Sequence, residues 1–444
     1  MKIREFTSTS EFSAKRPFKL KLEAPKDEGA NCFSILVGEN GTRKSRTMRD
    51  IVDIVVPGSP RQSELITRKA GRVRFWGAST VPLVVAVSGV ATDRFPSRLG
   101  SKRYRGNVSR YSYIGPRTDN NLVSRVQAVQ QIAAAILAEH ETLKSRSPQL
   151  RGAFSILKLH PGMYFELTVD QTLGVEWSAS RVKQAIESSR AHVHGDALHG
   201  DLLQRCARFL QRRKRAQIRL DLDNSKVVDI GYSNADVLHL LLQIGVLRIG
   251  DCNVINTKGE HLDLKELSSG QWHLLSSLVF VAATVKDNTL LLVDEPENSL
   301  HPAWQQQYLP LLQKAINSSK GVHVVVSTHS PHVASSLSPE VAEVIALRCG
   351  RSLVTAKPLA SGPYGWAADD ILRVAFGLET TRSRAFSRKM DATLKLFAKG
   401  NRKNPALVKK VQALEAIAPN LPEDDAVREM IYTMAALVQR DTED

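Results

Sequence analysis

The chain has 444 residues, of which 42% are hydrophobic and 24% are charged, and its formal net charge is +16. Apart from the basic excess, these values are ordinary for a soluble globular protein with a sizeable core and more than one lobe. The excess leaves two alternatives open: a polyanionic partner, such as nucleic acid or nucleotide phosphates, or a solvated Lys/Arg surface without a partner.

The cysteines and the apolar segments argue against several classes of protein. The four cysteines lie far apart and form no CxxC pair, which argues against a disulfide framework and against a zinc site. The first residues, MKIREFTSTSEF, lack the apolar stretch of a signal peptide. The longest apolar-rich run, Leu274–Val285, is too short to span a bilayer. We therefore expect a cytoplasmic protein without a membrane partner.

The first motif along the chain is a strand, a glycine-containing loop and a helix. FSILV, at Phe33–Val37, is a short continuous apolar run, typical of a strand that is buried on both faces. GENGTRKS, at Gly38–Ser45, follows it, and a helix is predicted from there to about Val55. Backbone N–H groups at a helix N-terminus bind phosphates, and glycine allows close approach. The expected nucleotide-binding residues of this loop are Gly38, Asn40, Gly41, Thr42, Arg43, Lys44, Ser45 and Thr47.

Two side chains of this loop have specific expected roles, and one residue departs from the pattern. Lys44 would reach the β- and γ-phosphates of ATP, and the Ser45 hydroxyl would bind Mg²⁺. The pattern GxxxxGK[ST] requires glycine where this chain has Arg43. An arginine should have a cost at a position that favours close backbone packing. Alone, the loop is also compatible with a surface turn, so its assignment depends on the motifs further along the chain.

Residues 71–118 are rich in predicted strands, among them GRVRFWG, VPLVVAVSGV and YSYIGPRT. They are consistent with an antiparallel β-lobe beside a nucleotide. Asp93 and Arg117 stand at strand ends, where we interpret them as ordinary turn residues.

Residues 121–218 are predicted to form a compact helical insertion, because their apolar residues follow a spacing of three and four. The helices lack sustained heptads, which argues against a long coiled-coil arm. The basic run QRRKR, at Gln211–Arg215, either binds the phosphate backbone of a nucleic acid or is a solvated face of a helix.

The next motif is LSSGQ, at Leu267–Gln271, which precedes an apolar helix. Its serines, its glycine and the positive end of the helix dipole can bind a γ-phosphate. On its own, the motif would be better explained as an N-capped core helix, and the acidic motif that follows it favours the phosphate site. The expected phosphate-binding residues are Ser268, Ser269, Gly270 and Gln271.

Two buried strands with polar ends follow. LLLVDE, at Leu290–Glu295, ends in two carboxylates. Asp294 is expected to hold Mg²⁺, and Glu295 is expected to act as general base on the attacking water. VHVVVSTHSP ends at His329, whose imidazole can contact the γ-phosphate and link to Glu295. Glu295 and His329 are therefore the candidate catalytic residues.

This order of motifs divides the chain into four predicted segments of an α/β fold with a P-loop mixed sheet. Residues 1–120 hold the phosphate loop and the β-lobe, and residues 121–218 hold the insertion. Residues 219–358 complete the ATPase head, and residues 359–444 form a helical C-terminal extension whose role the sequence does not indicate.

The set GENGTRKS, LSSGQ, DEPENSLHP and STHSP resembles the ATP-binding-cassette (ABC) ATPases of the SMC-like, DNA-handling branch. SLHP after the acidic pair, and the long separation of the phosphate loop from LSSGQ, point to that branch. The short insertion and the C-terminal GWAADDILRVAFGLETTRS are most similar to compact bacterial anti-phage ATPases of the Septu and retron-associated type.

The resemblance implies an ABC-ATPase head that binds ATP and Mg²⁺ and pairs head to tail as a homodimer or higher homo-oligomer. The LSSGQ motif of one copy would then face the nucleotide of the other. The resemblance also implies a separate HNH nuclease subunit, nucleic acid as a further partner, and no nuclease activity in this chain. Related ABC folds carry a Gln that touches Mg²⁺ and the attacking water, and we do not find its position in the sequence. Because of Arg43 and the unplaced Gln, we expect slow basal hydrolysis.

Three alternatives stay open. The first is a DNA-repair or recombination ATPase that acts on DNA without a nuclease partner. The second is the nucleotide-binding subunit of a transporter, against which SLHP, the chain length and the basic charge argue. The third is a nucleotide-binding scaffold that no longer hydrolyses ATP, for which Arg43 is the reason.

Overall fold

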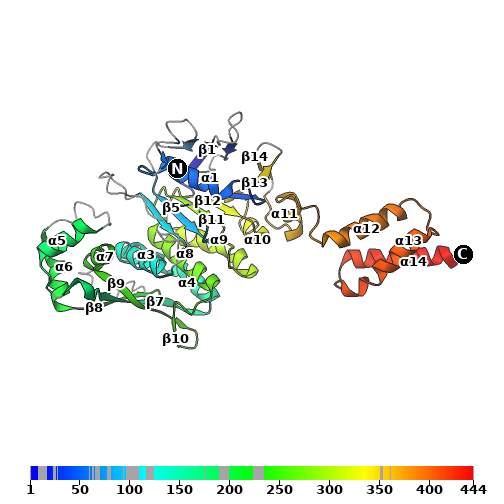
Figure 1. Ribbon diagram of the computed structural model, residues 1–444. Coiled ribbons are helices and arrows are strands. Elements are labelled where there is room, and N and C mark those ends of the chain that lie inside the picture. Colours follow the sequence, from blue (N-terminus) through cyan, green and yellow to red (C-terminus); the bar gives the residue numbers. More distant parts are fainter. Residues whose placement is uncertain are drawn as a thin grey trace. The chain divides into compact units, whose positions relative to one another are not determined.

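The computed structural model of the chain describes residues 2–8, 18–23, 27, 29–59, 61–62, 65, 71–77, 82–93, 95–96, 110–116, 125–174, 176–189, 200–223, 235–350, 354–360 and 362–443. The chain forms two compact units, Met1–Ile371 and Leu372–Asp444 (Figure 1). Within the described ranges, none of the helices combines the length and the apolar character needed to cross a lipid bilayer.

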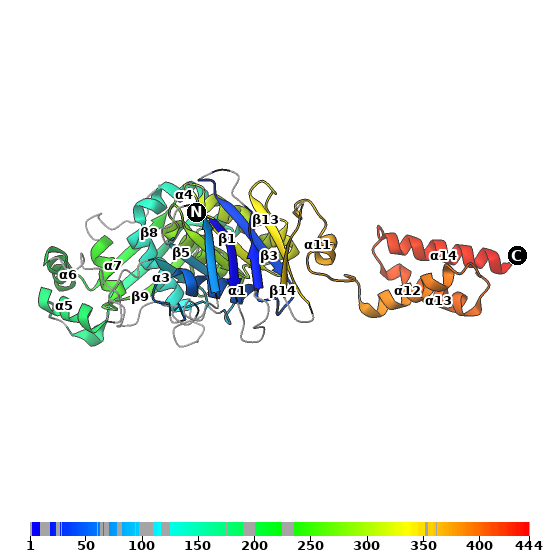
Figure 2. The same cartoon turned by 90° about the horizontal axis from the view of Figure 1, so that it is seen from above.

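A seven-stranded sheet is the centre of the first unit, with the strand order β14-β13-β3-β12-β11-β5-β6 (Figures 1 and 2). Its strands are β3 (Cys32–Gly38), β5 (Val84–Ser88), β6 (Tyr111–Ile114), β11 (Leu290–Asp294), β12 (His323–Thr328), β13 (Ala342–Cys349) and β14 (Val354–Pro358). All neighbouring strands are parallel except β13 and β14. Strands β3, β12 and β11 are almost entirely buried, which explains their continuous apolar sequence. The predicted α/β class with a mixed sheet is confirmed.

A second, three-stranded antiparallel sheet lies beside the helix that follows the phosphate loop. Its order is β2-β1-β4, and its strands are β1 (Lys2–Ser8), β2 (Phe18–Lys21) and β4 (Gly71–Trp76). Helix α1 (Lys44–Val55) shares one buried cluster with both sheets, to which Phe6 of β1, Met48 of α1 and Leu36 of β3 belong. Helix α1 is therefore held in place by a core that it shares with both sheets.

The sequence-based placement of β5 and β6 in the antiparallel lobe is corrected by the structure. Of the strands described within residues 71–118, β4 joins the three-stranded sheet, whereas β5 pairs in parallel with β11, and β6 with β5. Every residue of β5 is buried. A strand without a polar face is suited to the interior of a parallel sheet, and not to a half-exposed antiparallel lobe.

The insertion between β6 and β11 combines helices with a four-stranded antiparallel sheet of order β10-β9-β7-β8. Its elements are α3 (Arg125–Ala138), α4 (His140–Ile156), β7 (Leu159–Val169), α5 (Ala179–Ser188), α6 (Gly200–Arg212), β8 (Arg215–Asp221), α7 (Ala235–Gln243), β9 (Leu247–Asn256) and β10 (His261–Asp263). The segment 121–218 thus contains β7 and the start of β8 in addition to the expected helices. Met163, Phe165 and Leu167 of β7 are buried and alternate with less buried residues, which is the period of a strand. The basic run Gln211–Arg215 is exposed at the end of α6.

Two long helices cover the central sheet on the side of the insertion (Figure 1). They are α8 (Ser269–Thr284) and α9 (Pro302–Ile316), and α8 packs against β5, β6 and α4. Helix α8 is buried over most of its surface, which explains why apolar residues lie on all of its sides. A short helix, α10 (Pro331–Ala334), follows His329.

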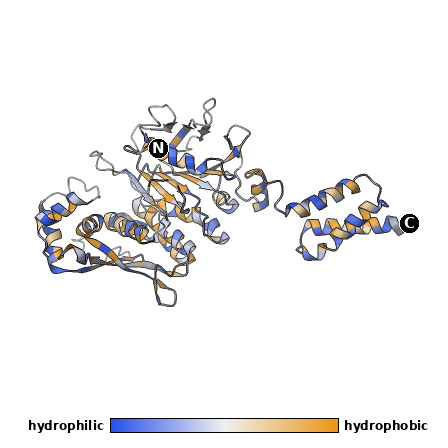
Figure 3. Cartoon of the chain, in the orientation of Figure 1, coloured by the Kyte–Doolittle hydropathy of each residue, from blue (hydrophilic) through white to orange (hydrophobic). Residues whose placement is uncertain are grey.

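The C-terminal unit is a small helical bundle, as the sequence pattern predicts. The helices of this part of the chain are α11 (Ala368–Val374), α12 (Arg384–Phe397), α13 (Pro405–Glu415) and α14 (Ala426–Glu443). Leu407, Val411 and Ile431 belong to a core formed by the last three of these helices. Their apolar and polar residues alternate with helical period, which Figure 3 shows as stripes of colour along each helix.

Candidate nucleotide-binding site

The phosphate loop leaves β3 and turns tightly into α1. A side chain at Gly38 would clash with the carbonyl oxygen of Leu347, so this position requires glycine. Gly41 has a φ of 84°, and the Thr42 hydroxyl donates a hydrogen bond of 2.8 Å to the carbonyl oxygen of Glu39. Asn40 and Gly41 are exposed, whereas Thr42 and Thr47 are buried. The loop is therefore a closed turn whose tip faces solvent at the N-terminus of a helix.

Arg43 adopts the conformation for which the motif normally uses glycine. Its φ is 68° and its ψ is 18°, in the left-handed region. An L-residue in this region costs roughly 1–2 kcal/mol, which glycine avoids. The turn is nevertheless formed, since the carbonyl oxygen of Arg43 accepts the first helical hydrogen bond from Thr47 N, at 2.8 Å. The departure from the motif therefore strains one residue and leaves the loop intact.

We expect Arg43→Gly to raise the free energy of unfolding of the nucleotide-free chain by about 0.5–1 kcal/mol. Relief of the left-handed strain exceeds the extra entropy that glycine gives the unfolded chain. Urea denaturation at neutral pH measures the change. Arg43→Ala is the control, because it removes the guanidinium and keeps the strain; a gain of equal size in both variants would contradict the backbone explanation.

The ammonium of Lys44 lies inside the loop. Nζ donates hydrogen bonds to the carbonyl oxygens of Gly38, at 2.7 Å, and Glu39, at 3.1 Å, and lies 3.4 Å from Nδ1 of His329. Burial lowers the pKa of Lys44 to about 8, although three nearby carboxylates favour the charged form. The group is poorly solvated, so phosphate oxygens would be favourable partners for it.

Ser45 and Asp294 form the candidate metal site. Ser45 Oγ donates a hydrogen bond of 3.0 Å to Asp294 Oδ1, and the Ser327 hydroxyl donates to the same oxygen. Burial raises the pKa of Asp294 to about 6 in spite of these hydrogen bonds. A hydroxyl and a carboxylate side by side are hard oxygen ligands of the kind that Mg²⁺ prefers. The residues present therefore fit a Mg²⁺ ion held by Ser45 and Asp294.

The raised pKa of Asp294 predicts a pH dependence of Mg²⁺ binding. Below about pH 6 the carboxyl is protonated and must lose its proton to bind a cation. Mg²⁺ affinity, measured by titration with a non-hydrolysable ATP analogue present, should fall about tenfold per pH unit below 6 and level off above it. Without metal, the stability of the fold depends on pH in the opposite direction. The pKa of Asp294 is higher in the folded chain than in the unfolded chain, so protonation of Asp294 stabilises the fold as pH falls through 6. Asp294→Asn should remove both effects, and a flat profile in the unsubstituted chain would contradict the assignment.

Glu295 and His329 meet at the ends of β11 and β12. Glu295 Oε1 lies 3.4 Å from His329 Nε2. The hydrogen bond from His329 lowers the pKa of Glu295, while partial burial opposes this shift. Glu295 is therefore ionised at neutral pH, which is the form that a general base requires. Its φ of 48° lies in the left-handed region, so the backbone turns sharply directly after Asp294.

Three residues of this site are not predicted by the sequence analysis. Oε1 of Glu297 accepts a hydrogen bond from the backbone N–H of His329. Gly89, after β5, lies so close to the turn that a side chain there would clash with the carbonyl oxygen of Glu295. Asn298 Nδ2 donates a hydrogen bond of 2.6 Å to the carbonyl oxygen of Gly89. The third carboxylate of DEPE is the sequence signal for Glu297, whereas a single glycine after a strand gives none.

The LSSGQ motif begins α8 as a capping box. The Ser268 hydroxyl accepts a hydrogen bond of 3.2 Å from Gln271 N, and Gln271 Oε1 accepts one of 2.9 Å from Ser268 N. Ser268 and Ser269 are exposed. Gly270 is buried, and a side chain there would clash with the carbonyl oxygen of Ser299. The motif thus packs its glycine against the turn after the acidic strand and leaves both serines facing solvent.

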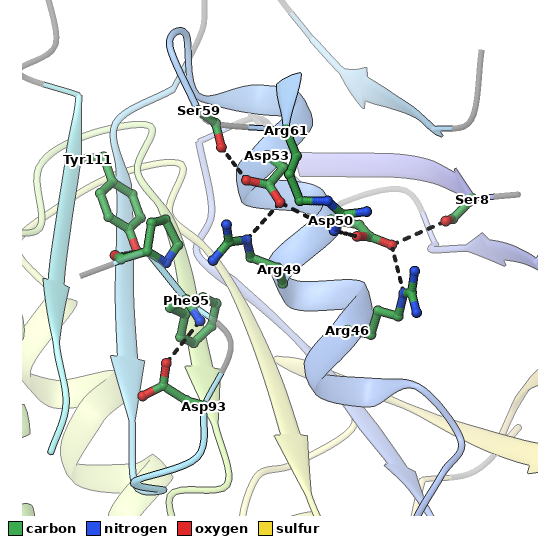
Figure 4. Close-up of polar contacts among 11 residues, drawn as sticks. Ser8, Arg46, Arg49, Asp50, Asp53, Ser59, Arg61, Asp93, Phe95 and Tyr111 are labelled. Carbon is green, nitrogen blue, oxygen red and sulfur yellow. Dashed lines mark hydrogen bonds and ion pairs between the residues drawn. The ribbon is translucent and has the colours of Figure 1, made fainter. Parts of the chain in front are cut away.

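A buried acid–base cluster anchors the second half of α1 (Figure 4). Asp50 and Asp53 are buried on this helix, and Arg49 Nε lies 2.7 Å from Asp53 Oδ2. Arg61 reaches both carboxylates, at 3.3 Å and 3.8 Å, and the Ser8 hydroxyl donates to Asp50 at 3.2 Å. The cluster connects α1 to β1 and to the segment after α1, and so fixes the helix that begins in the phosphate loop.

Asp93, also drawn in Figure 4, has a structural role. Its carboxylate accepts hydrogen bonds from Phe95 N, at 2.9 Å, and from the Tyr113 hydroxyl, at 2.6 Å.

Arg117 lies outside the described residues. In the described part of the chain, β5 is followed by Gly89 and β6 by Gly115, so neither strand end supplies the Gln that ABC folds carry.

Comparison with known proteins gives relatives for part of the chain. Residues 199–334, which include LSSGQ, the acidic pair and His329, match the AAA ATPase domain. The chain resembles SMC-like ATPases of the Septu and retron type. The Septu protein PtuA of Bacillus thuringiensis is 32% identical over 98 residues, which are 21% of this chain and 24% of that protein. The Retron Ec83 probable ATPase of Escherichia coli is 25% identical over 133 residues, which are 28% of this chain and 24% of that protein.

The matches span about a quarter of the length of these relatives. The Retron Vc95 probable ATPase of Vibrio cholerae serotype O1 biovar El Tor is 28% identical over 144 residues, which are 30% of this chain and 26% of that protein. Among solved structures, the Smc head domain of Pyrococcus furiosus is similar over 81% of this chain and 96% of that chain, with 11% identity and a TM-score of 0.35. This last similarity is too low to support an inference about function.

Proposed function

We propose that the chain binds and hydrolyses ATP and uses the nucleotide to control a nuclease partner in anti-phage defence. One observation carries the proposal: Lys44, Ser45, Asp294, Glu295 and His329 converge through direct contacts at the carboxyl ends of three adjacent parallel strands. Open α/β sheets bind their ligands at this edge.

The contacts give each side chain a role. The charge of Lys44 and the N–H groups at the start of α1 bind phosphate oxygens. Glu295 takes a proton from the attacking water, and His329, 3.4 Å away, orients its carboxylate. Mg²⁺ held by Ser45 and Asp294 would supply positive charge for the phosphate oxygens.

A phosphate-release assay on the purified chain tests the enzymatic part of the proposal. We expect hydrolysis of ATP with a turnover below the enzyme median of about 10 per second, because Arg43 departs from the loop motif and, in the described part of the chain, no Gln directly follows β5 or β6. ATP binding without hydrolysis would favour a scaffold that no longer turns over. Absence of both binding and hydrolysis would refute the proposal.

Head-to-tail pairing of two chains is part of the proposal, and the exposure of the LSSGQ serines supports it. Ser268 and Ser269 stand at the N-terminus of the 16-residue helix α8 and face solvent. That helix end favours negative charge, and a second copy that carries ATP would supply it. Light scattering should show a dimer or larger oligomer that requires ATP, and Ser269→Arg should abolish it by blocking the approach.

A nuclease subunit and nucleic acid are the proposed partners. The resemblance to Septu and retron ATPases and the net charge of +16 support them. Affinity purification of the chain with and without ATP should recover a nuclease. ATPase stimulation by DNA ends or gaps, with no nuclease recovered, would instead favour the DNA-repair alternative.

A further inference from the structure

Glu297 is a buried carboxylate beside the proposed catalytic pair, and the function proposed above does not use it. Oε1 accepts the hydrogen bond from His329 N, whereas Oε2 is buried and makes no hydrogen bond within the described part of the chain. Burial raises the pKa of Glu297, and hydrogen bonding, chiefly from the His329 N–H and also from Thr328, opposes this shift. Burying a carboxylate with incomplete hydrogen bonding is costly, so the contact with His329 N calls for an explanation.

The turn that carries Glu297 is fixed on both sides. Glu295 N donates a hydrogen bond of 2.9 Å to the carbonyl oxygen of Ser327. Asn298 Nδ2 donates one of 2.6 Å to the carbonyl oxygen of Gly89. With the turn tied to β12 and to β5, the Glu297 carboxylate is a firm point of attachment for the segment after β12. His329 lies in that segment, between the end of β12 and the start of α10.

We infer that Glu297 is a positioning residue, which holds the backbone of His329 so that the imidazole stays within reach of Glu295 and Lys44. Nε2 and Nδ1 of the imidazole each lie 3.4 Å from their partners, Glu295 Oε1 and Lys44 Nζ. Both distances are at the long end of hydrogen bonding, so a small displacement of the backbone would lose both contacts. The inference deepens the proposed ATPase function and rests on it.

The test is Glu297→Gln in the full chain. The amide keeps the size of the side chain but replaces the carboxylate that accepts from His329 N with a weaker, neutral acceptor. We expect kcat for ATP to fall roughly tenfold or more, with ATP affinity changed less than about twofold. In a His329→Ala background, Glu297→Gln should cost less than about twofold, because the residue acts through His329. Additive losses, or an unchanged kcat, would overturn the inference.

Glu343→Gln is the matched control for a merely structural effect. Glu343 is another nearly buried carboxylate of the same sheet, paired with Lys2 at 3.1 Å and hydrogen-bonded to the Ser34 hydroxyl at 2.7 Å. Its substitution should lower stability and leave kcat unchanged. A loss of kcat in both variants, in proportion to their loss of stability, would count against positioning.

Amide hydrogen exchange at His329 gives a readout that does not depend on hydrolysis. Exchange should become about tenfold faster in Glu297→Gln and in Glu297→Asp, whose carboxylate is too short to reach the amide. Unchanged exchange in both variants would show that Glu297 does not hold the amide of His329, and would refute the inference. A chain that fails to hydrolyse ATP would refute the proposed function, and the exchange experiment would still decide whether Glu297 holds His329.

Discussion

Glu295→Gln should lower ATP hydrolysis at least about 100-fold while ATP binding persists, because the amide cannot accept a proton from the attacking water. Glutamine keeps the length of the side chain. Its backbone would adopt the same left-handed conformation as that of glutamate, with a φ of 48°, so the turn after β11 should be unchanged. The ATP-bound oligomer should accumulate, since the step that consumes the nucleotide is blocked. Single-turnover phosphate release and light scattering with ATP measure the two effects.

Glu340→Gln is the control for this loss of one negative charge. Glu340 is exposed in the segment between α10 and β13, so its substitution should leave turnover unchanged. If Glu295→Gln hydrolyses ATP at the rate of the unsubstituted chain, Glu295 is not the general base. Simultaneous loss of ATP binding would instead indicate that the substitution damages the phosphate loop.

The sequence predicts those parts of the fold that are determined by residues close to one another along the chain. The strands β3, β11 and β12 are buried on both faces, so each reads as an uninterrupted apolar run. Each run is followed directly by the residues of the site. Because carboxyl ends of parallel strands lie at one edge of the sheet, this pattern alone predicts that Lys44, Asp294 and His329 are neighbours.

The parts that the sequence does not predict depend on pairings between distant segments. The apolar run of β5 indicates a buried strand, but only its pairing with β11 decides its place in the central sheet. Gly89 belongs to the site because it approaches the carbonyl oxygen of Glu295, more than 200 residues away in sequence. The partners of Asp50 and Asp53 include residues on β1 and after α1, which no helical spacing indicates.

Arg43 combines one feature that the sequence predicts with one that it does not. The motif predicts that glycine is preferred there, but the sequence does not reveal whether the loop still forms. The structure shows the arginine in the left-handed conformation, with Thr47 N bonded to its carbonyl oxygen at 2.8 Å. A local backbone cost of roughly 1–2 kcal/mol is small beside the stability contributed by the buried core around α1, which is why the loop tolerates it.

Lys44→Ala should weaken ATP binding by roughly 10- to 100-fold. The substitution removes the ammonium that is hydrogen-bonded to carbonyl oxygens of the phosphate loop and that would bind the phosphates. The nucleotide-free fold should not lose stability in proportion, since burial lowers the pKa of Lys44 to about 8 and so disfavours its charge in the empty loop. ATP affinity by calorimetry and unfolding in urea without nucleotide measure the two effects separately.

The pH dependence of the same binding reaction distinguishes the charge of Lys44 from its bulk. Above about pH 8 the empty loop holds a neutral amine, so binding must take up a proton, and ATP affinity of the unsubstituted chain should fall as pH rises. Lys44→Ala should lose this dependence, whereas Lys314→Ala, at an exposed position on α9, should keep both the affinity and its pH profile. Equal ATP affinity in all three proteins would show that phosphates do not bind at this loop, and the contacts of Ser45, Asp294 and Glu295 would then need a different ligand to explain them.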